Sequence, residues 1–409
     1  MLQTVDVGIE SLDNYKSIIG VDKMKELRKL ADELRGARIL HLNATPYGGG
    51  VSELLRSELP LLRDLGLNAD WKVIFGDEKF FTITKSFHNA LQGGEFNLDN
   101  NVKEVYLSYN TENAQLLEEQ YDYIIVHDPQ PLALLHFKGR NNAKWVWRCH
   151  IDTSEPNQSI WNFLSPFVLE YDATVFTMNS FVPPNLPAAK NFVIPPAIDP
   201  LSPKNMNISA SLCRRVISWV GVDLRKPLLT QISRFDPWKD PEGVIDVYRM
   251  VKQDIPDLQL ALVGSMALDD PEAWQIYSRI AEYDKGDPDA YVFTNLTGVG
   301  NIEVNAFQQL SQVVIQKSIR EGFGLVVSET SWKGTPVVAG RTGGIPMQIE
   351  DGMSGFLCES NEDYARRISY LLQNQQEASV MGERGREKVR EQFLMPRLIT
   401  DELRCLCSL

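Results

Sequence analysis

The sequence predicts an α/β protein made of two doubly wound domains of similar size that face one another across a cleft. Short, nearly continuous apolar runs alternate with amphipathic helical segments, which is typical of parallel strands covered on both faces. The chain has 409 residues, more than the roughly 250–300 at which single hydrophobic cores stop growing. Ligands bind at the carboxyl ends of the strands in such sheets, so we expect functional residues directly after strands.

The composition indicates a soluble enzyme and argues against a nucleic-acid-binding protein. Hydrophobic residues make up 43% of the chain and charged residues 23%, which is ordinary for a globular protein. The formal net charge of −13 disfavours nucleic acid as a partner, because phosphate backbones are bound by clustered Lys and Arg. The five cysteines are scattered and odd in number, so we expect no disulfide framework.

No targeting or membrane segment is predicted. The first ten residues carry acids and no apolar core, which is unlike a signal peptide. No apolar run approaches the about 20 residues that a helix needs to span a bilayer. We therefore expect a cytoplasmic protein without membrane contact.

The first half of the chain contains one series of strands and helices. A helical pattern covers residues 12–36, strand 38–43 follows, and an amphipathic helix is predicted over 52–65. The turn between that strand and that helix lacks a P-loop or dinucleotide fingerprint. It fits either a plain tight turn or a close approach of backbone to an anionic ligand. Its glycines are Gly48, Gly49 and Gly50. Further strands are predicted at 71–75, 123–126, 144–149, 173–176 and 192–194.

A linker is predicted where two prolines, at 195 and 196, precede the polar stretch 198–207. We therefore place a first domain at residues 1–197 and a second at 198–391. A C-terminal helix over 392–409 is expected to pack back on the first domain. Strands of the second domain are predicted at 228–233, 259–263, 291–293, 313–315 and 336–338.

The most informative stretch follows strand 313–315. A Gly-Phe-Gly turn at 322–324 leads into a helix from about Leu325, and free backbone N–H groups and the helix dipole converge at such a turn. Glu321 in the turn and Glu329 in the helix are separated by roughly 9–12 Å along the axis at ~1.5 Å per residue. This suits two carboxylates that bind separate hydroxyl-bearing parts of one extended ligand, although an acidic chain also produces the spacing by chance.

A second candidate site follows strand 228–233. Arg234 and Lys239 lie on either side of a proline-containing turn, where they can converge on one diphosphate. Arg supplies forked donors and Lys a point charge. The alternative is two exposed basic residues in an ordinary loop.

Two His–Asp clusters follow successive strands of the first half. His127 and Asp128 come after strand 123–126, whereas His150 and Asp152 come after strand 144–149. If those strands are neighbours, the clusters line one wall, and a functional role outweighs a purely structural one. A metal would need three converging ligands, such as the two histidines and one Asp, but the spacing does not demand it. No Gly-x-Ser-x-Gly elbow supports a hydrolase, and Asp287-Pro288-Asp289 is interpreted as a turn.

These motifs resemble those of a known enzyme group. The stretches Ser233–Lys239, Arg320–Glu329 and Gly343–Gly352 are similar to the donor half of retaining glycosyltransferases of the GT-B fold, which has two Rossmann-like domains. That broad group contains the glycogen, sucrose and trehalose-phosphate synthases. The stretches Val126–Pro131, Trp147–Asp152 and Phe87–Gly93 narrow the likeness to trehalose glycosyltransferring synthases, which join a nucleotide-linked glucose to free glucose. The resemblance runs from about Tyr15 to Asn374.

The resemblance implies a role for each matching residue. Arg234 and Lys239 would hold the donor diphosphate, and Glu329 the ribose. Glu321 and the amides of Gly322, Phe323 and Gly324 would hold glucose hydroxyls, and the Gly48, Gly49 and Gly50 loop would approach the phosphates. His150 would lie near the anomeric carbon and the 6-hydroxyl of the donor glucose, whereas Asp128 and Asp152 would face the acceptor. The catalytic set would be Arg234, Lys239, Glu321 and His150.

The resemblance also implies a mechanism. The leaving phosphate would accept the proton of the acceptor on the same face, so that no protein nucleophile is needed. Positioning and charge stabilisation would supply the catalysis. No tightly bound cofactor and no metal site are expected, with Mg²⁺ at most an activator.

The expected reaction is NDP-glucose plus D-glucose giving α,α-trehalose and NDP, reversibly, in a homodimer. The sequence does not decide whether the nucleotide of the donor is ADP, UDP or GDP. A trehalose phosphorylase, which uses inorganic phosphate instead of the nucleotide, is the nearest alternative. A further alternative is another NDP-sugar glycosyltransferase of the same group. A regulator that binds sugar nucleotides without turnover would predict damage to the acceptor motifs, yet both His–Asp clusters are intact.

Overall fold

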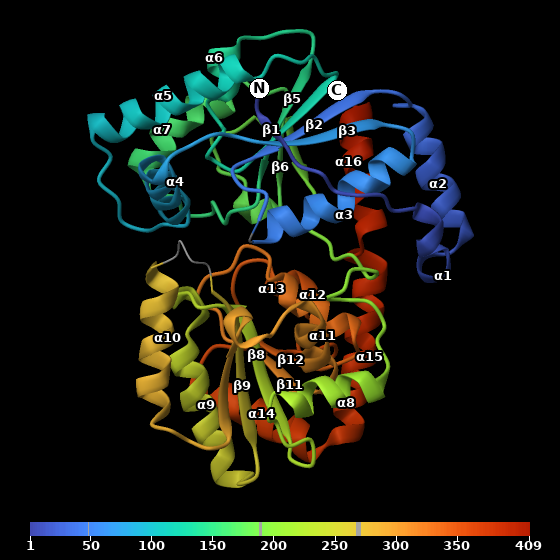
Figure 1. Cartoon of the computed structure of the whole chain (residues 1–409), viewed down its shortest axis with the longest axis vertical. Helices are drawn as coiled ribbons and strands as arrows, with labels where there is room; N and C mark the ends of the chain where they lie inside the picture. The colour runs from blue at the N-terminus through green and yellow to red at the C-terminus, as the bar shows by residue number, and fades with distance from the viewer. Residues whose placement is uncertain (48, 188–189, 267–270) are drawn as a thin grey trace. The chain divides into compact units, whose positions relative to one another are not determined.

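The computed structural model describes residues 1–47, 49–187, 190–266 and 271–409 (Figure 1). It contains two compact units. Unit 1 comprises Met1–Pro196 together with Met395–Leu409, and unit 2 comprises Ala197–Leu394. Each unit is an α/β layer around a largely parallel sheet, so the predicted fold class of two doubly wound, Rossmann-like domains is confirmed.

Unit 1 is organised around a seven-stranded sheet with the order β1-β3-β2-β4-β5-β6-β7. All neighbouring strands are parallel except β1, which pairs antiparallel with β3. The chain order reverses between β2 and β4, which makes that position the topological switch point where ligands bind in such sheets. The strands are β1 (Gln3–Thr4), β2 (Arg38–Asn43), β3 (Asn68–Val73), β4 (Tyr123–His127), β5 (Lys144–Cys149), β6 (Ala173–Phe176) and β7 (Asn191–Val193).

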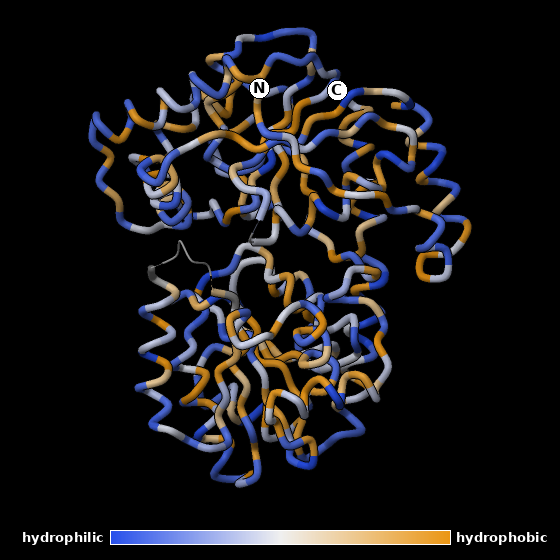
Figure 2. Tube along the Cα trace, viewed as in Figure 1, coloured by the Kyte–Doolittle hydropathy of each residue, from blue (hydrophilic) through white to orange (hydrophobic). Residues whose placement is uncertain are grey.

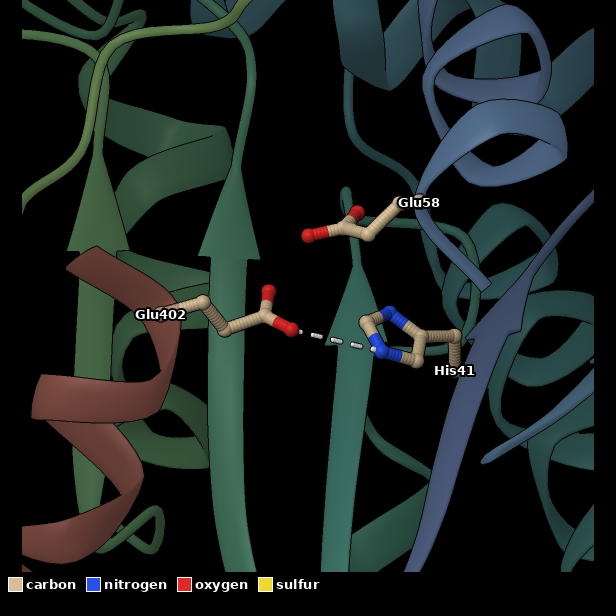
Figure 3. A group of neighbouring side chains, drawn as sticks. All are labelled: His41, Glu58 and Glu402. Atoms are coloured by element: carbon tan, nitrogen blue, oxygen red, sulfur yellow. Dashed lines mark ion pairs between the residues drawn. The ribbon is translucent and has the colours of Figure 1, made fainter. Parts of the chain in front are cut away.

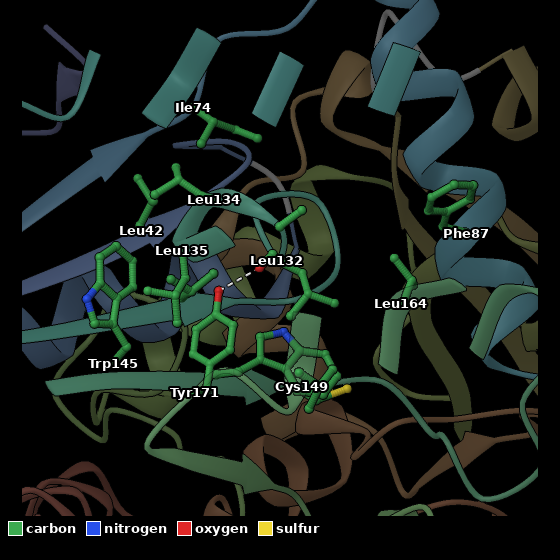
Figure 4. Close-up of a cluster of buried hydrophobic side chains, with 14 of the residues drawn as sticks. Leu42, Ile74, Phe87, Leu132, Leu134, Leu135, Trp145, Cys149, Leu164 and Tyr171 are labelled. Carbon is green, nitrogen blue, oxygen red and sulfur yellow. Dashed lines mark hydrogen bonds between the residues drawn. The ribbon is translucent and has the colours of Figure 1, made fainter. Parts of the chain in front are cut away.

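The two faces of this sheet differ in chemistry. One face carries an apolar core in which Leu42, Trp145 and Trp147 pack with side chains from α4, α5, α6 and α7 (Figure 4). The opposite face carries His41, His127 and Arg148, all buried. The helices of unit 1 are α1 (Lys16–Ile19), α2 (Val21–Asp32), α3 (Gly50–Asp64), α4 (Glu78–Leu91), α5 (Asn100–Leu116), α6 (Leu134–Lys138), α7 (Gln158–Val168) and α16 (Met395–Cys407).

Unit 2 is organised around a six-stranded parallel sheet with the order β10-β9-β8-β11-β12-β13. In chain order this is the 3-2-1-4-5-6 arrangement of the Rossmann fold, with its switch point between β8 and β11. Its strands are β8 (Leu228–Arg234), β9 (Gln259–Ser265), β10 (Ala290–Thr294), β11 (Val313–Gln316), β12 (Val337–Gly340) and β13 (Phe356–Cys358).

The helices of unit 2 cover both faces of its sheet. One face packs in a core with α9, α10 and α14, and the other in a core with α8 and α11. In both units the strands are the apolar interior and the helix surfaces are polar, as the hydropathy along the trace shows (Figure 2). The helices are α8 (Ala210–Trp219), α9 (Pro241–Asp254), α10 (Pro271–Asp284), α11 (Asn301–Leu310), α12 (Leu325–Trp332), α13 (Ile345–Gln348), α14 (Asn361–Gln373) and α15 (Gln375–Gln392).

Most predicted strands are confirmed within a few residues, with informative exceptions. The strand predicted at 71–75 is β3 and begins earlier, at Asn68. The short strands β1 and β13 were not predicted. The helical pattern of 12–36 is divided at Gly20, whose φ of +82° separates α1 from α2. No helix in the described ranges is long and apolar enough to cross a membrane.

Candidate active site

The predicted phosphate-binding residues flank the switch point of unit 2. Arg234 is the last residue of β8, and Lys239 ends the short 3₁₀ helix η4 (Pro237–Lys239) in the loop that follows. Glu321 lies in the loop after β11, the parallel neighbour of β8. The two loops that carry these residues therefore start from adjacent strands at one edge of the sheet, where an anionic ligand of a doubly wound domain binds.

Lys239 and Glu321 form an ion pair. The ammonium lies 2.5 Å from Oε2 of Glu321, and both side chains are largely buried. The same carboxylate oxygen accepts a hydrogen bond from the Ser318 hydroxyl at 3.1 Å. Arg234 is exposed and pairs with Asp236 at 3.1 Å. Each predicted phosphate-binding cation thus has a carboxylate partner in unit 2, which lowers the cost of holding a cation where part of its solvation is lost.

Lys317 was left without a role by the sequence. Its ammonium forms an ion pair with Asp240, the N-cap residue of α9 in the loop after β8. Asp240 has a left-handed φ of +44°. Lys317 therefore joins the loop that carries Lys239 to the end of β11 and helps to fix the position of that loop.

The Gly-Phe-Gly turn is formed as predicted. Gly324, at φ +83°, is the N-cap of α12, a conformation that L side chains rarely adopt. The amide of Gly344 donates to the carbonyl of Gly322 at 2.9 Å, and Gln348 Nε2 donates to the carbonyl of Phe323 at 2.5 Å. The turn is thus held through its carbonyls. Within the described ranges, the backbone amides of residues 322–324 donate no hydrogen bond, so these N–H groups are available to a ligand.

Glu329 lies within α12, as predicted, but it is nearly fully buried, at 2% exposure. Its Oε2 accepts from Gln308 Nε2 at 3.0 Å, and its Oε1 lies 3.5 Å from the Lys204 ammonium. Lys333, one helical turn further on, donates to the backbone carbonyl of Glu329 and to Asn205 Oδ1. Burial lowers the pKa of Lys333 to about 7. Sequence reasoning missed these partners, although the spacing of four between Glu329 and Lys333 was visible.

The glycine-rich turn of unit 1 leads into α3. Gly48 lies outside the described residues. Gly49, with φ +85°, is the N-cap of α3, and Gly50 is its first residue. The turn follows β2, one of the two strands at the switch point of this sheet.

The two His–Asp clusters of unit 1 meet, because β4 and β5 are neighbours. His127 Nδ1 lies 2.9 Å from His150 Nε2, and Asp128 Oδ1 accepts from the amide of His150 at 2.9 Å. Asp128 has a left-handed φ of +63°, and burial raises the pKa of its carboxyl to about 7. Burial also lowers the pKa of both His127 and His150. Neutral imidazoles therefore stand beside a carboxyl group that titrates near neutral pH.

Asp152 has a different environment. Its Oδ1 accepts from the amide and the hydroxyl of Ser154 at 3.0 and 2.6 Å, so it caps the turn that follows β5. His127, His150 and an Asp, the alternative metal set that the spacing did not demand, are not among the groups with metal-ligand spacing in the described part of the chain. The group there with metal-ligand spacing is instead His41, Glu58 and Glu402. Asp287 and Asp289 pair with Lys252 and Lys226, which agrees with their interpretation as a turn.

Sequence reasoning also missed a buried polar group behind the histidines. His127 Nε2 lies 3.1 Å from His41 Nδ1, and Arg148 donates to Glu402 Oε2 at 2.9 Å. The signal available was the alternation of residues on β2, β4 and β5, which puts His41, His127 and Arg148 on the face opposite the leucines and tryptophans. Nothing in the sequence connected Glu402, about 250 residues further along the chain, to that face.

Two family models match the chain. Residues 41–183 match the family described as trehalose synthase, N-terminal domain, and residues 219–388 match glycosyl transferases group 1. The trehalose synthase of Rubrobacter xylanophilus is 52% identical over 414 residues, covering 100% of this chain and 99% of that protein. The trehalose synthase of Pyrococcus horikoshii is 45% identical, covering 98% and 97%. A trehalose phosphorylase of Grifola frondosa is 30% identical, covering 88% of this chain and 56% of that protein.

Solved structures agree in fold at much lower identity. HepE of Anabaena in complex with UDP-glucose has a TM-score of 0.70 at 18% identity and covers 91% of this chain and 100% of that one. The trehalose 6-phosphate synthase of Burkholderia multivorans has a TM-score of 0.68 at 14% identity, with coverage of 91% and 98%. At such identities the likeness shows the fold alone. Together with the near-complete match to trehalose synthases, it establishes that the chain belongs to the trehalose synthase family of GT-B glycosyltransferases.

Proposed function

We propose that the protein transfers glucose from an NDP-glucose to free D-glucose, with retention of the anomeric configuration, and thereby forms α,α-trehalose. The observation that carries this proposal is the pairing of Lys239 with Glu321 beside the amides of residues 322–324, which donate no hydrogen bond to the described residues. A cation, a hydroxyl-binding carboxylate and free N–H groups at one switch point match the parts of a sugar diphosphate. HepE, of the same fold, is described in complex with UDP-glucose.

On the donor side, unit 2 would act by charge. As the bond between the anomeric carbon and the phosphate oxygen breaks, negative charge grows on the diphosphate. Lys239 and Arg234 would stabilise that charge. Lys239 would then exchange its ion pair with Glu321 for the phosphate, and the freed carboxylate would accept hydrogen bonds from glucose hydroxyls.

On the acceptor side, unit 1 would orient the second glucose. The acceptor hydroxyl forms the new bond to the anomeric carbon on the face that the phosphate leaves, and its proton passes to the departing phosphate oxygen. Asp128 and Asp152 would accept hydrogen bonds from the acceptor, and His150 would contact the donor sugar near the reacting carbon. The proposal uses no covalent protein intermediate and no resident metal, and Mg²⁺ has at most an activating role.

Product analysis tests the proposal. Purified protein is mixed with glucose and, separately, with ADP-, UDP- and GDP-glucose. We expect a non-reducing disaccharide whose two equivalent anomeric protons give one signal with an α coupling by NMR, together with one equivalent of NDP. The Lys239→Ala variant serves as the matched negative control. If no nucleotide sugar yields the disaccharide, the proposal is wrong.

A trehalose phosphorylase is the second candidate, favoured by the 30% identity to the Grifola frondosa enzyme. The chain spans only 56% of that protein, whereas it spans 99% of the Rubrobacter synthase. Incubation of trehalose with inorganic phosphate separates the two activities. Formation of glucose 1-phosphate without added nucleotide would favour the phosphorylase.

A further inference from the structure

Three histidines form a continuous line across the sheet of unit 1. They lie on or directly after the adjacent strands β2, β4 and β5. His150 Nε2 is 2.9 Å from His127 Nδ1, and His127 Nε2 is 3.1 Å from His41 Nδ1. Consecutive ring centroids are 5.2 and 5.4 Å apart. His41 and His127 are fully buried, whereas His150 is half-buried at the carboxyl edge of the sheet.

The inner end of this line faces a carboxylate. His41 Nε2 has no hydrogen-bond partner within the described part of the chain. Glu402 Oε1, on α16, lies 3.5 Å from it (Figure 3). The other oxygen of Glu402 accepts from Arg148 at 2.9 Å. Arg148 lies 2.9 Å from Glu402 but 3.7 Å from Glu58, so we place the negative charge of this pair on Glu402. Burial and Glu402 raise the pKa of Glu58.

A metal ion is the competing explanation for this cluster, because ligand atoms of His41, Glu58 and Glu402 lie within 4.8 Å of one another. However, the guanidinium of Arg148 is 2.9 Å from Glu402 and 3.7 Å from Glu58. This guanidinium already supplies the positive charge, and it would repel a divalent cation placed among the carboxylates. The cluster is charge-balanced with one ionised carboxylate and one guanidinium.

The number of ring N–H hydrogens restricts which tautomers the three histidines can adopt together. Each neutral imidazole carries one N–H, and each nitrogen–nitrogen contact accommodates one hydrogen. Two arrangements satisfy both contacts, one with all hydrogens directed toward Glu402 and one with all directed away. In the second, the bare nitrogen of His41 would face the carboxylate, which is repulsive. Glu402 therefore selects the first, which leaves His150 with Nε2 protonated and Nδ1 bare.

We propose that Glu402, acting through His41 and His127, fixes the tautomer of His150 so that its Nδ1 accepts a hydrogen bond from a hydroxyl of the bound sugar. No hydrogen bond of the described residues uses that nitrogen. The assignment of a sugar to this position rests on the proposed function, whereas the tautomer itself does not. Glu402, His41 and His127 are positioning residues, because they act only through His150.

Ring-nitrogen NMR of the full-length, ¹⁵N-histidine-labelled protein without substrate tests the tautomer. We expect His150 protonated at Nε2 and His41 protonated at Nε2 in the wild type. Glu402→Gln removes the charge but can present an N–H to His41, so we expect His150 to move to the other tautomer or to a mixture. Arg148 keeps the carboxyl group of Glu58 at 3.7 Å in this variant. The exposed His136, paired with Glu170, provides an internal reference.

The matched control is Asp401→Asn, which changes the neighbouring residue of α16. Asp401 pairs with Arg397 and Arg404, so this variant should leave the His150 signals unchanged. If Glu402→Gln unfolds unit 1, His41→Asn replaces it, because a short amide can either donate to or accept from His127. Unchanged His150 signals in a folded Glu402→Gln protein would overturn the relay. So would a stoichiometric metal in the purified wild type that the variant loses.

Transfer kinetics test how the tautomer is used. Glu402→Gln should lower kcat/KM for transfer about tenfold, the effect of one hydrogen bond, and leave the Kd for free NDP unchanged. Absence of transfer in the wild type would contradict the proposed function and leave the NMR result standing. A changed tautomer with unchanged kcat/KM would overturn the role of Nδ1 as the acceptor.

Discussion

Lys239 and Glu321 neutralise one another at 2.5 Å in the free protein. We predict that Lys239→Ala lowers kcat roughly 10²–10³-fold, because one charge contact in the transition state is typically worth about 2.7–4 kcal/mol. Lys226→Ala is the control, since Lys226 forms a comparable ion pair with Asp289 but precedes β8 and so lies at the amino end of the sheet. Steady-state kinetics at saturating donor, together with Tm, decide the outcome. A Lys239→Ala enzyme with near wild-type turnover would remove Lys239 from the phosphate site.

The carboxylates at 321 and 329 have different surroundings and should behave differently. Glu329 is buried against Gln308 and Lys204, and its replacement by Gln should weaken inhibition by free NDP. Glu321→Gln should leave that inhibition nearly intact and reduce use of the glucosyl part of the donor. Inhibition constants for NDP and kcat/KM for NDP-glucose distinguish the two. Identical behaviour would contradict the assignment of ribose to one residue and glucose to the other.

Asp128 should give unit 1 a measurable pH dependence. Its pKa is raised from 3.8 to about 7 in the folded protein, so the folded state holds this proton more tightly than the unfolded state. The stability of the wild type should therefore decrease as pH rises through that window. Asp128→Asn keeps an oxygen that can accept from the amide of His150, and it should abolish this slope. Tm measured across the window tests the prediction, and equal slopes for both proteins would contradict it.

The same substitution tests the acceptor role. A carboxylate that accepts from sugar hydroxyls binds better when ionised, so KM for glucose should fall in the wild type as pH rises through about 7. The Asn variant should have a raised KM at high pH and little change in NDP affinity. A lower Tm with unchanged glucose kinetics would assign Asp128 to structure alone.

Residues that directly follow strands could be predicted from the sequence, whereas their partners could not. Arg234, Glu321 and His150 stand where apolar runs end, and that pattern is local. The partner of Glu329 is Gln308, and the carboxylate that faces His41 is Glu402. Both come from other helices, and the sequences of those helices do not indicate which residues they contact. Tertiary packing determines which residue becomes a buried partner. In the sequence, such a partner is visible only as a polar residue at a position where an apolar one is expected.

The loop after β12 supports the Gly-Phe-Gly turn at close range. A Cβ at Gly343, whose φ is +52°, would lie 1.7 Å from the carbonyl oxygen of Glu321. Gly343→Ala should therefore displace the turn and reduce activity strongly. Gly352→Ala is the control, because Gly352 has φ +77° and a Cβ there would meet no atom of the described residues within 4 Å, so the variant should suffer only the left-handed strain of about 1–2 kcal/mol. Activity and Tm of both variants test this, and equal effects would mean that strain, not contact, matters at Gly343.

Among the elements, the interior strands were the most predictable. β4, β5 and β11 are short apolar runs because both their faces are covered. The edge strands β1 and β13 contain two and three residues, too few for any periodicity. Their pairing is determined by the neighbouring strand rather than by a pattern of their own.

On the scale of the whole molecule, α16 belongs to unit 1 although α15, which precedes it, belongs to unit 2. It packs against α2 and α3 and buries Leu398, Ile399 and Leu403 completely. We predict that amide hydrogens of α16 exchange together with those of β4 as denaturant is added, whereas those of α15 exchange with α14. Hydrogen exchange followed by mass spectrometry of peptides from these four elements tests this. If the amide hydrogens of α16 exchange together with those of α15 instead, the division into units does not describe the stability of the chain.

The return of the chain to unit 1 at Met395 has a consequence for synthesis on the ribosome. The sheet of unit 2 is complete once residue 358 has emerged, and α14 and α15 complete its core before α16 is made, so this unit can fold on the nascent chain. Unit 1, although its strands are made first, lacks Glu402 until α16 is translated. Arg148 meanwhile lacks the carboxylate that lies 2.9 Å from it and keeps only the more distant contact with Glu58, at 3.7 Å, of these two. The segment translated first is therefore the one that finishes folding last, and translation that stops before Met395 leaves its polar face without cover.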